Sequence, residues 1–246
     1  MTDSLISREV IQKLDERSVE EHTRDHYRDL FRLYRGVFVD IDSGEVSLGN
    51  RDEGNYITIE EDGTLVFNGN ATVFDDLQVG LNNLAKGATA PTDRTYDHGT
   101  GGIAYPVLGF AKNEYIWFDV QTSHSMKLST VLDVHLHFVL PNTITIGHKI
   151  VWQLDVMYAA VDGTWTVPVG SPYTATHTVA ANDDTTGRIL DIADIPAVNT
   201  TVSTLYKCRL TRIDGTATEY ASECYLEFID CHYEKDTAGS RTEYSK

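Results

Sequence analysis

One stretch alternates apolar and polar side chains: Val131-Leu132-Asp133-Val134-His135-Leu136-His137-Phe138-Val139-Leu140. A period of two is that of a β-strand, in which successive side chains point to opposite faces of a sheet. The strand therefore has an apolar face suited to a protein core. Its opposite face carries Asp133, His135 and His137.

The same alternation recurs elsewhere, and the runs are separated by turn sequences such as Asp162-Gly163 and Asp214-Gly215. The further strands are expected at 115–122, 149–160, 205–213 and 224–234. Several alternating strands with turns between them are typical of an antiparallel sandwich or barrel. We predict a mainly β protein whose C-terminal domain is a jelly-roll-like β-sandwich. Residues 163–203 are expected to form long loops around one short strand.

Three parts are predicted along the chain: a helical N-terminal anchor (1–36), a slim β linker (37–80) and the sandwich (81–246). Within the linker, Asp62-Gly63 favours a hairpin between strands near 56–60 and 65–67. A lone hairpin is marginal in water, so we expect this segment to pair across a subunit interface or to lie against the sandwich. Residues 81–104 are rich in Gly and Thr and predict a surface loop.

The N-terminal part has the signals of a helix. Ser18 and Glu21 form a capping box. The residues that follow place one apolar stripe on the helix, with a spacing of i, i+3, i+4 and i+7: Tyr27, Leu30, Phe31 and Tyr34. The stripe can pack on its own domain or on a partner. We favour a partner, because no comparable helix follows in the chain.

The composition limits the function. The chain has 246 residues, 20 Lys and Arg, and 37 Asp and Glu, which gives a formal net charge of −17. Free nucleic acid is excluded as a partner, because phosphate binding needs a basic surface. Three explanations of this negative charge are open: it keeps the protein soluble, it helps the protein dock onto a basic partner, or it binds cations.

The three cysteines have no CxxC spacing, and their number is odd. This argues against a disulfide framework or a zinc finger and fits assembly in a reducing cytoplasm. The chain begins without a secretion signal, and no apolar run is long enough to span a membrane. We also find no phosphate-binding loop, so we predict no cofactor.

Asp133, His135 and His137 are the first candidate site. Two imidazoles and a carboxylate on one strand face suit metal binding. Similar groups on other strands would widen the face if those strands were neighbours: Asp119, Gln121, Gln153, Asp155, Asp230 and His232. A polar face buried at a subunit interface and a solvated face are the alternatives, and we favour the interface.

Exposed aromatic residues are the second candidate site, because they can stack on sugar rings. Trp152 lies on an apolar face and is expected in the core, whereas Trp165 follows a turn and is expected at the surface. We therefore assign a low-priority ligand contact to Trp165. No Gly-x-Ser-x-Gly motif occurs, and the many acidic residues single out no catalytic pair. We predict that the protein is not an enzyme and has no catalytic residues.

The C-terminal segment resembles a known group of proteins. Its pattern Asp-x-His-Tyr-Glu-x-Asp-x-x-Gly-Ser-Arg, from Asp230 to Arg241, is similar to the end of a group of tailed-bacteriophage virion proteins. The stretch from Glu60 to Asp76 resembles the linker of the same group. The resemblance covers roughly residues 56–246.

The resemblance implies a structural protein of the virion, made in the host cytoplasm. It leaves open a collar or tail fibre, a head fibre or spike, and a capsid decoration protein. It also implies a homotrimer that docks through its N-terminal helices on portal, adaptor, tail or capsid proteins. The alternatives are a receptor- or carbohydrate-binding module that contacts a host-surface glycan and, less favoured, a metal-dependent enzyme that uses His135 and His137.

Overall fold

The computed structural model describes residues 36–40, 42–97, 102–141, 144–196, 201–215 and 218–245. The predicted helical anchor, including Tyr27, Leu30, Phe31 and Tyr34, lies outside the described residues apart from Gly36. The chain divides into two compact units, and the boundary along the sequence falls between Ala71 and Thr72. The described part is mainly β, as predicted.

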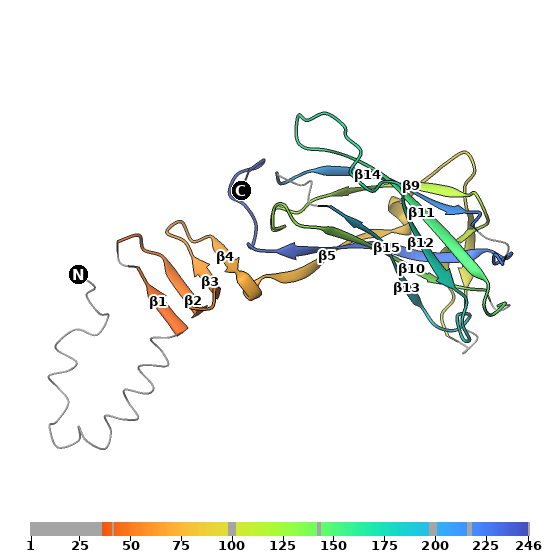
Figure 1. Cartoon of the computed structure of the whole chain (residues 1–246), viewed down its shortest axis with the longest axis horizontal. Helices are drawn as coiled ribbons and strands as arrows, with labels where there is room; N and C mark the ends of the chain where they lie inside the picture. Colours follow the sequence, from red (N-terminus) through yellow and green to blue (C-terminus); the bar gives the residue numbers. More distant parts are fainter. Residues whose placement is uncertain are drawn as a thin grey trace, which may run out of the picture. The chain divides into compact units, whose positions relative to one another are not determined.

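The first unit is a small antiparallel sheet with the strand order β1-β2-β3-β4 (Figure 1). Its elements are β1 (Val37–Val39), β2 (Val46–Asn50), β3 (Asn55–Ile59), β4 (Leu65–Asn68) and the 3₁₀ turn η1 (Gly69–Ala71). The predicted hairpin is confirmed as β3 and β4. Gly63 takes a positive φ of 82° in its turn, and the Asp62 carboxylate accepts a hydrogen bond from the Thr64 N–H.

The second unit is a two-sheet sandwich (Figure 1). The first sheet has the order β13-β10-β15-β8-β7, and β5 also pairs with β15. Its strands are β5 (Val73–Gly80), β7 (Thr92–Tyr96), β8 (Tyr105–Phe110), β10 (Leu132–Val139), β13 (Arg188–Ile195) and β15 (Cys224–Lys235). We call this sheet the histidine sheet, after His135, His137 and His232.

The second sheet has the order β12-β11-β14-β9-β6. Its strands are β6 (Ala85–Lys86), β9 (Tyr115–Gln121), β11 (Lys149–Ala159), β12 (Tyr173–Thr178) and β14 (Leu205–Ile213), and the 3₁₀ turn η2 (Leu81–Asn83) precedes β6. We call it the tryptophan sheet, after Trp117 on β9. The eight strands from β8 to β15 give the orders β8-β15-β10-β13 and β9-β14-β11-β12, which is the double Greek key of a jelly roll.

The core lies between the two sheets and is built from the apolar face of each alternating strand. Leu132, Val134 and Leu136 of β10 are at most 1% exposed. Trp152 is fully buried, as predicted, and packs edge-to-face on Phe110 with 5.0 Å between the ring centroids. The three cysteines are free thiols buried in the same core.

Two expectations about loops are wrong. The expected loop at 81–104 contains β6 and β7, and the expected loops at 163–203 contain two strands, β12 and β13. β7 pairs with β8 at the sheet edge, and four of its five residues are exposed, so it lacks the apolar alternation of a core strand. β5 pairs with β15, which places 73–80 in the sandwich, whereas the predicted linker ran to residue 80.

No helix in the described residues is both long and apolar enough to cross a membrane.

Candidate functional site

Strand pairing gathers histidines and aspartates on the outer face of the histidine sheet. In the antiparallel register, Asp133 of β10 lies opposite His232 of β15, and His135 lies opposite Asp230. On the other side of β15, Asp76 of β5 lies opposite His232. Paired residues of neighbouring strands point to the same face, so three strands supply one cluster.

On the other side of β10, strand β13 adds Asp194 opposite Asp133 and Asp191 opposite His135. A β-bulge between Val134 and His135 brings both aspartates into line with the same face. We call the whole set the His–Asp cluster: Asp76, Asp133, His135, His137, Asp191, Asp194, Asp230 and His232.

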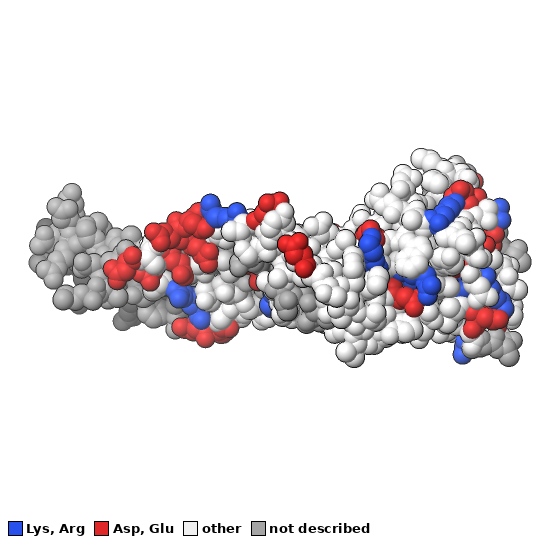
Figure 2. All heavy atoms as spheres, turned by 90° about the horizontal axis from the view of Figure 1, so that it is seen from above, with Lys and Arg blue, Asp and Glu red and all other residues white. Residues whose placement is uncertain are grey.

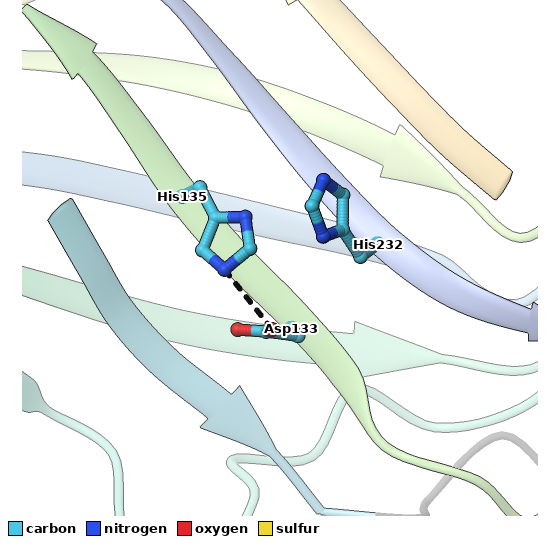
Figure 3. Close-up of side chains that lie close together, drawn as sticks. All are labelled: Asp133, His135 and His232. Carbon is cyan, nitrogen blue, oxygen red and sulfur yellow. Dashed lines mark ion pairs between the residues drawn. The ribbon is translucent and has the colours of Figure 1, made fainter. Parts of the chain in front are cut away.

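The cluster is tightly connected. His135 Nε2 lies 3.0 Å from Asp133 Oδ2, and the His135 and His232 rings meet edge-to-face with 4.2 Å between centroids (Figure 3). His232 Nε2 lies 3.0 Å from Asp76 Oδ1 and 3.3 Å from Asp230 Oδ2. Figure 3 shows the two imidazoles facing each other from β10 and β15, with Asp133 beside His135.

Asp230 is the most buried member. It is 4% exposed and lies 3.2 Å from His137 Nε2 and 3.8 Å from His135 Nδ1. Burial raises the pKa of Asp133; the nearby His135 opposes this rise, and the charges of Asp191 and Asp194 add to it. The cluster is thus a concentrated negative site with imidazoles at its centre.

The structure brings together all three predicted residues of this site: Asp133, His135 and His137. His137 lies at the margin, where its ring stacks on Phe228 with 4.0 Å between centroids. Asp230 and His232 join the cluster as expected. Asp119, Gln121, Gln153 and Asp155 do not, because β9 and β11 belong to the other sheet. Asp76 was missed, since its strand was taken for a linker.

A second site lies on the outer face of the tryptophan sheet. Trp117 of β9 is 40% exposed and packs edge-to-face on Tyr115, with 6.4 Å between centroids. The Arg209 guanidinium of β14 lies 5.5 Å from the Trp117 ring centroid and donates two hydrogen bonds to Asp155 Oδ2 at 3.1 and 3.0 Å. These contacts hold the tryptophan ring in a fixed orientation.

A neighbouring row continues this surface. Lys207 Nζ donates a hydrogen bond to Asp119 Oδ2 at 2.8 Å and lies 5.9 Å from the Trp165 ring centroid. Trp165 is 41% exposed, as predicted. Figure 2 shows basic residues on the visible face of the sandwich lying directly beside acidic ones. Lys207 and Arg209 are both paired with carboxylates, and the exposed rings of Trp117 and Trp165 add apolar surface beside them.

A groove of about 290 Å³ adjoins Trp117. One wall is formed by Trp117 and Asp119, and the other by the segment from β5 to β6, which contributes Gln78 and Asn83. An aromatic wall with amide and carboxylate groups around it is suited to a polar ligand that also has an apolar face. We call this groove and the rings of Trp117 and Trp165 the tryptophan surface.

No family model matches the chain, and no curated protein matches it. Among solved structures, it is similar to a family GH115 4-O-methyl-alpha-glucuronidase, at 12% identity and a TM-score of 0.35, over 63% of this chain and 18% of that one. It is similar to TmCBM61, solved with β-1,4-galactotriose, at 8% identity and a TM-score of 0.27, over 66% and 88% of the two chains.

It is also similar to infectious bursal disease virus, Gx strain, at 10% identity and a TM-score of 0.27, over 82% of this chain and 47% of that one. The chain thus spans less than a fifth of the glucuronidase and less than half of the viral chain. At these TM-scores, none of the three likenesses assigns a function.

Proposed function

We propose that this protein is a non-enzymatic carbohydrate-binding module that binds a neutral glycan on the tryptophan surface. The observation that carries the proposal is the half-exposed Trp117 ring, which forms the wall of a groove rimmed by polar side chains. A sugar ring has an apolar face, which stacks on an aromatic ring, and hydroxyl groups, which need hydrogen-bond partners. Gln78, Asn83 and Asp119 offer both donors and acceptors along the groove.

Charge favours a neutral glycan over an anionic one. The chain has a formal net charge of −17. The two cations nearest the tryptophans, Lys207 and Arg209, already pair with Asp119 and Asp155. A sulfated or uronic glycan would have to compete with these carboxylates, whereas a neutral one leaves the pairs intact.

The ring of Trp117 is held before a ligand arrives. Arg209 covers one side of it and is itself fixed by Asp155, so binding need not restrict a free side chain. Trp165 extends the surface on the far side of Lys207. We expect Trp117 to contribute more than Trp165, since Trp117 lines the groove and Trp165 does not.

A neutral-glycan array first identifies which glycans the protein binds. Affinity electrophoresis in a gel that contains the soluble polysaccharide bound most strongly then tests the proposal. We expect saturable retardation, a loss of at least tenfold in affinity (about 1.4 kcal/mol) in Trp117→Ala, and a smaller loss in Trp165→Ala. Ile189→Ala is the matched control, because Ile189 is an exposed apolar residue of the other sheet, at 64%. No glycan bound, or equal retardation of Trp117→Ala and the wild type, would overturn the proposal.

A second candidate, a homotrimeric virion appendage, is favoured by the first unit. Its described residues bury Ser47 and Thr58 but leave Val37, Phe38 and Leu48 between 39 and 45% exposed. A single-layered sheet needs another layer to cover its apolar side chains. A second and third copy of the chain would provide it.

Light scattering after size exclusion tests the trimer. We expect three times the chain mass of 27.5 kDa for the full chain, and a shift toward one chain in Phe38→Glu/Leu48→Glu. A wild-type monomer would remove the trimer and leave the glycan-binding proposal untouched. Docking on portal, adaptor, tail or capsid proteins remains part of this second candidate.

A further inference from the structure

We propose that the His–Asp cluster binds one divalent transition-metal ion, of the Zn²⁺ class, through Asp133, His135 and His232. The ligand atoms of these three side chains lie within 4.8 Å of one another. They come from two adjacent strands of a sheet rather than from loops. The inference does not rest on glycan binding, because its three ligand residues lie on β10 and β15, whereas Trp117 and Trp165 lie outside the histidine sheet. Of the groove wall, only Gln78 and Val79 on β5 belong to that sheet.

The spacing fits a small ion. Ligand bonds of 2.0–2.2 Å in a tetrahedral site place neighbouring ligand atoms about 3.4 Å apart. In the cluster, His135 Nε2 lies 3.0 Å from Asp133 Oδ2, and the imidazoles of His135 and His232 are separated by 4.2 Å between centroids. Small side-chain rotations therefore suffice to form the site, without movement of the strands.

Unsatisfied buried atoms support a ligand here. Four side-chain atoms of the cluster are buried without a hydrogen-bond partner: Asp133 Oδ1, His135 Nδ1, His137 Nε2 and Asp230 Oδ1. Asp230 is 4% exposed, and its free oxygen points to the imidazoles of His135 and His137. A buried carboxylate without a full set of partners is costly, and a cation beside it offsets that cost.

The charge of the cluster points the same way. Three of its five carboxylates, Asp76, Asp133 and Asp230, form ion pairs with histidines alone, and no lysine or arginine in the described residues pairs with any of the five. With neutral histidines the formal charge of the cluster is −5. Elsewhere on the sandwich, acidic residues such as Asp119 and Asp155 pair with a lysine or arginine. A divalent ion would supply the missing positive charge.

The ligand types select the class of metal. Imidazole nitrogen favours Zn²⁺, Cu²⁺, Ni²⁺ and Fe²⁺, whereas Ca²⁺ and Mg²⁺ prefer six or more oxygens. Asp76 and Asp230 act as positioning residues, because their carboxylates lie beside ring nitrogens of the histidines rather than serving as ligands themselves. Asp76 Oδ1 and Asp230 Oδ2 lie 3.0 and 3.3 Å from His232 Nε2, which orients that ring, and Asp230 Oδ1 lies 3.8 Å from His135 Nδ1. Three protein ligands leave a fourth position to water or to a neighbouring molecule.

Isothermal titration of Zn²⁺ into the full-length, tag-free and chelator-treated protein tests the proposal. We expect one ion per chain and at least a tenfold loss of affinity in His135→Gln and in His232→Gln. Asp230→Asn should weaken binding by 10- to 100-fold, as other outer partners of metal ligands do. His148→Gln is the matched control, since His148 contacts the Glu219 carbonyl outside the cluster.

A spectrum of the wild type with Co²⁺ makes the test independent of how the variants fold. We expect the intense visible bands of a four- or five-coordinate ion, displaced by one equivalent of Zn²⁺. The proposal is overturned by the absence of stoichiometric Zn²⁺ binding, by binding that survives both histidine substitutions, by an equal loss in His148→Gln, or by a weak octahedral Co²⁺ spectrum.

Discussion

Replacing Arg212 by methionine should destabilise the sandwich far more than the same change at Arg209. Both residues lie on β14, three positions apart, so their side chains leave opposite faces of the strand. Arg212 points inward and is fully buried. Its guanidinium donates hydrogen bonds to the carbonyl oxygens of Phe110 at 2.7 Å, Ser222 at 2.5 Å, and Tyr220.

The magnitude follows from what methionine leaves behind. Methionine retains most of the apolar volume of the arginine stem. It leaves the buried carbonyl groups of Phe110 and Tyr220, and the part-buried carbonyl group of Ser222, without this donor. Each unsatisfied buried group costs about 1–3 kcal/mol. Removal of the buried charge offsets part of the upper range, but it also breaks the ion pair between Arg212 Nη2 and the buried Glu219 Oε1, which lie 3.9 Å apart. We therefore expect a loss of roughly 3–5 kcal/mol, the usual cost of breaking a buried charged pair. Arg209 is half-exposed and pairs with Asp155, so Arg209→Met should cost about 1 kcal/mol or less.

Urea unfolding followed by tryptophan fluorescence measures both variants. All three tryptophans lie in the sandwich, so the signal reports on this unit alone. We expect the midpoint of Arg212→Met to fall and its m-value to stay constant. If Arg212→Met and Arg209→Met differ by less than about 1 kcal/mol, the three carbonyl contacts are not what holds this end of the sandwich, and the reasoning is refuted.

Two further predictions concern buried groups. The fully buried Asp183 carboxylate accepts hydrogen bonds from the Ala180 N–H and Arg188 Nε and contacts His177. Burial by itself raises the pKa of this carboxylate, but these contacts outweigh burial and hold the pKa below its ordinary value. The ionised form of Asp183 is thus stabilising above the unfolded pKa of about 3.9. Asp183→Asn should therefore lower the free energy of unfolding by about 1–3 kcal/mol at pH 7. Measured by urea unfolding, this deficit should shrink as the pH falls below about 4, and a deficit that stays constant would contradict the prediction. Burial raises the pKa of the Cys224 thiol to about 12 and also raises the pKa values of Cys208 and Cys231. A thiol reagent at pH 8 should therefore label three cysteines in urea and almost none in the native protein. Rapid labelling of the native protein would instead show that the core opens.

The sandwich strands were predictable where one face is apolar and the other is polar. β9, β10, β11, β14 and β15 were all found by their period of two, and their bounds differ from the prediction by one residue at most. β7 was missed because its sequence Thr-Asp-Arg-Thr-Tyr has no apolar face, since this edge strand buries only its last residue, Tyr96. Edge strands are held by backbone pairing, and composition says little about that.

The candidate sites were only partly predictable for a related reason. Side chains alternate between the two faces along β10, and this depends only on the local sequence. Asp133, His135 and His137 could therefore be placed on one face from the sequence. Their partner His232 lies on a strand far along the chain, and only the register between β10 and β15 places it opposite Asp133. Arg212 could not be predicted at all. It is a charged residue at an inward position on β14 because three carbonyl groups from other segments accept its hydrogen bonds there, and the local sequence pattern does not predict such contacts.

The outer faces of the two sheets differ in a way that the fold does not require. On the tryptophan sheet, charges opposite one another have opposite signs, as in Lys207 with Asp119 and Arg209 with Asp155, which stabilises the pairing of strands. On the histidine sheet, Asp133 lies directly opposite Asp194, and like charges in that position weaken a sheet. A purely structural face gains nothing from this arrangement, since threonine or lysine at 194 would pair better. The proposed cation would turn the same carboxylates into favourable partners and would account for a destabilising pair beside two imidazoles.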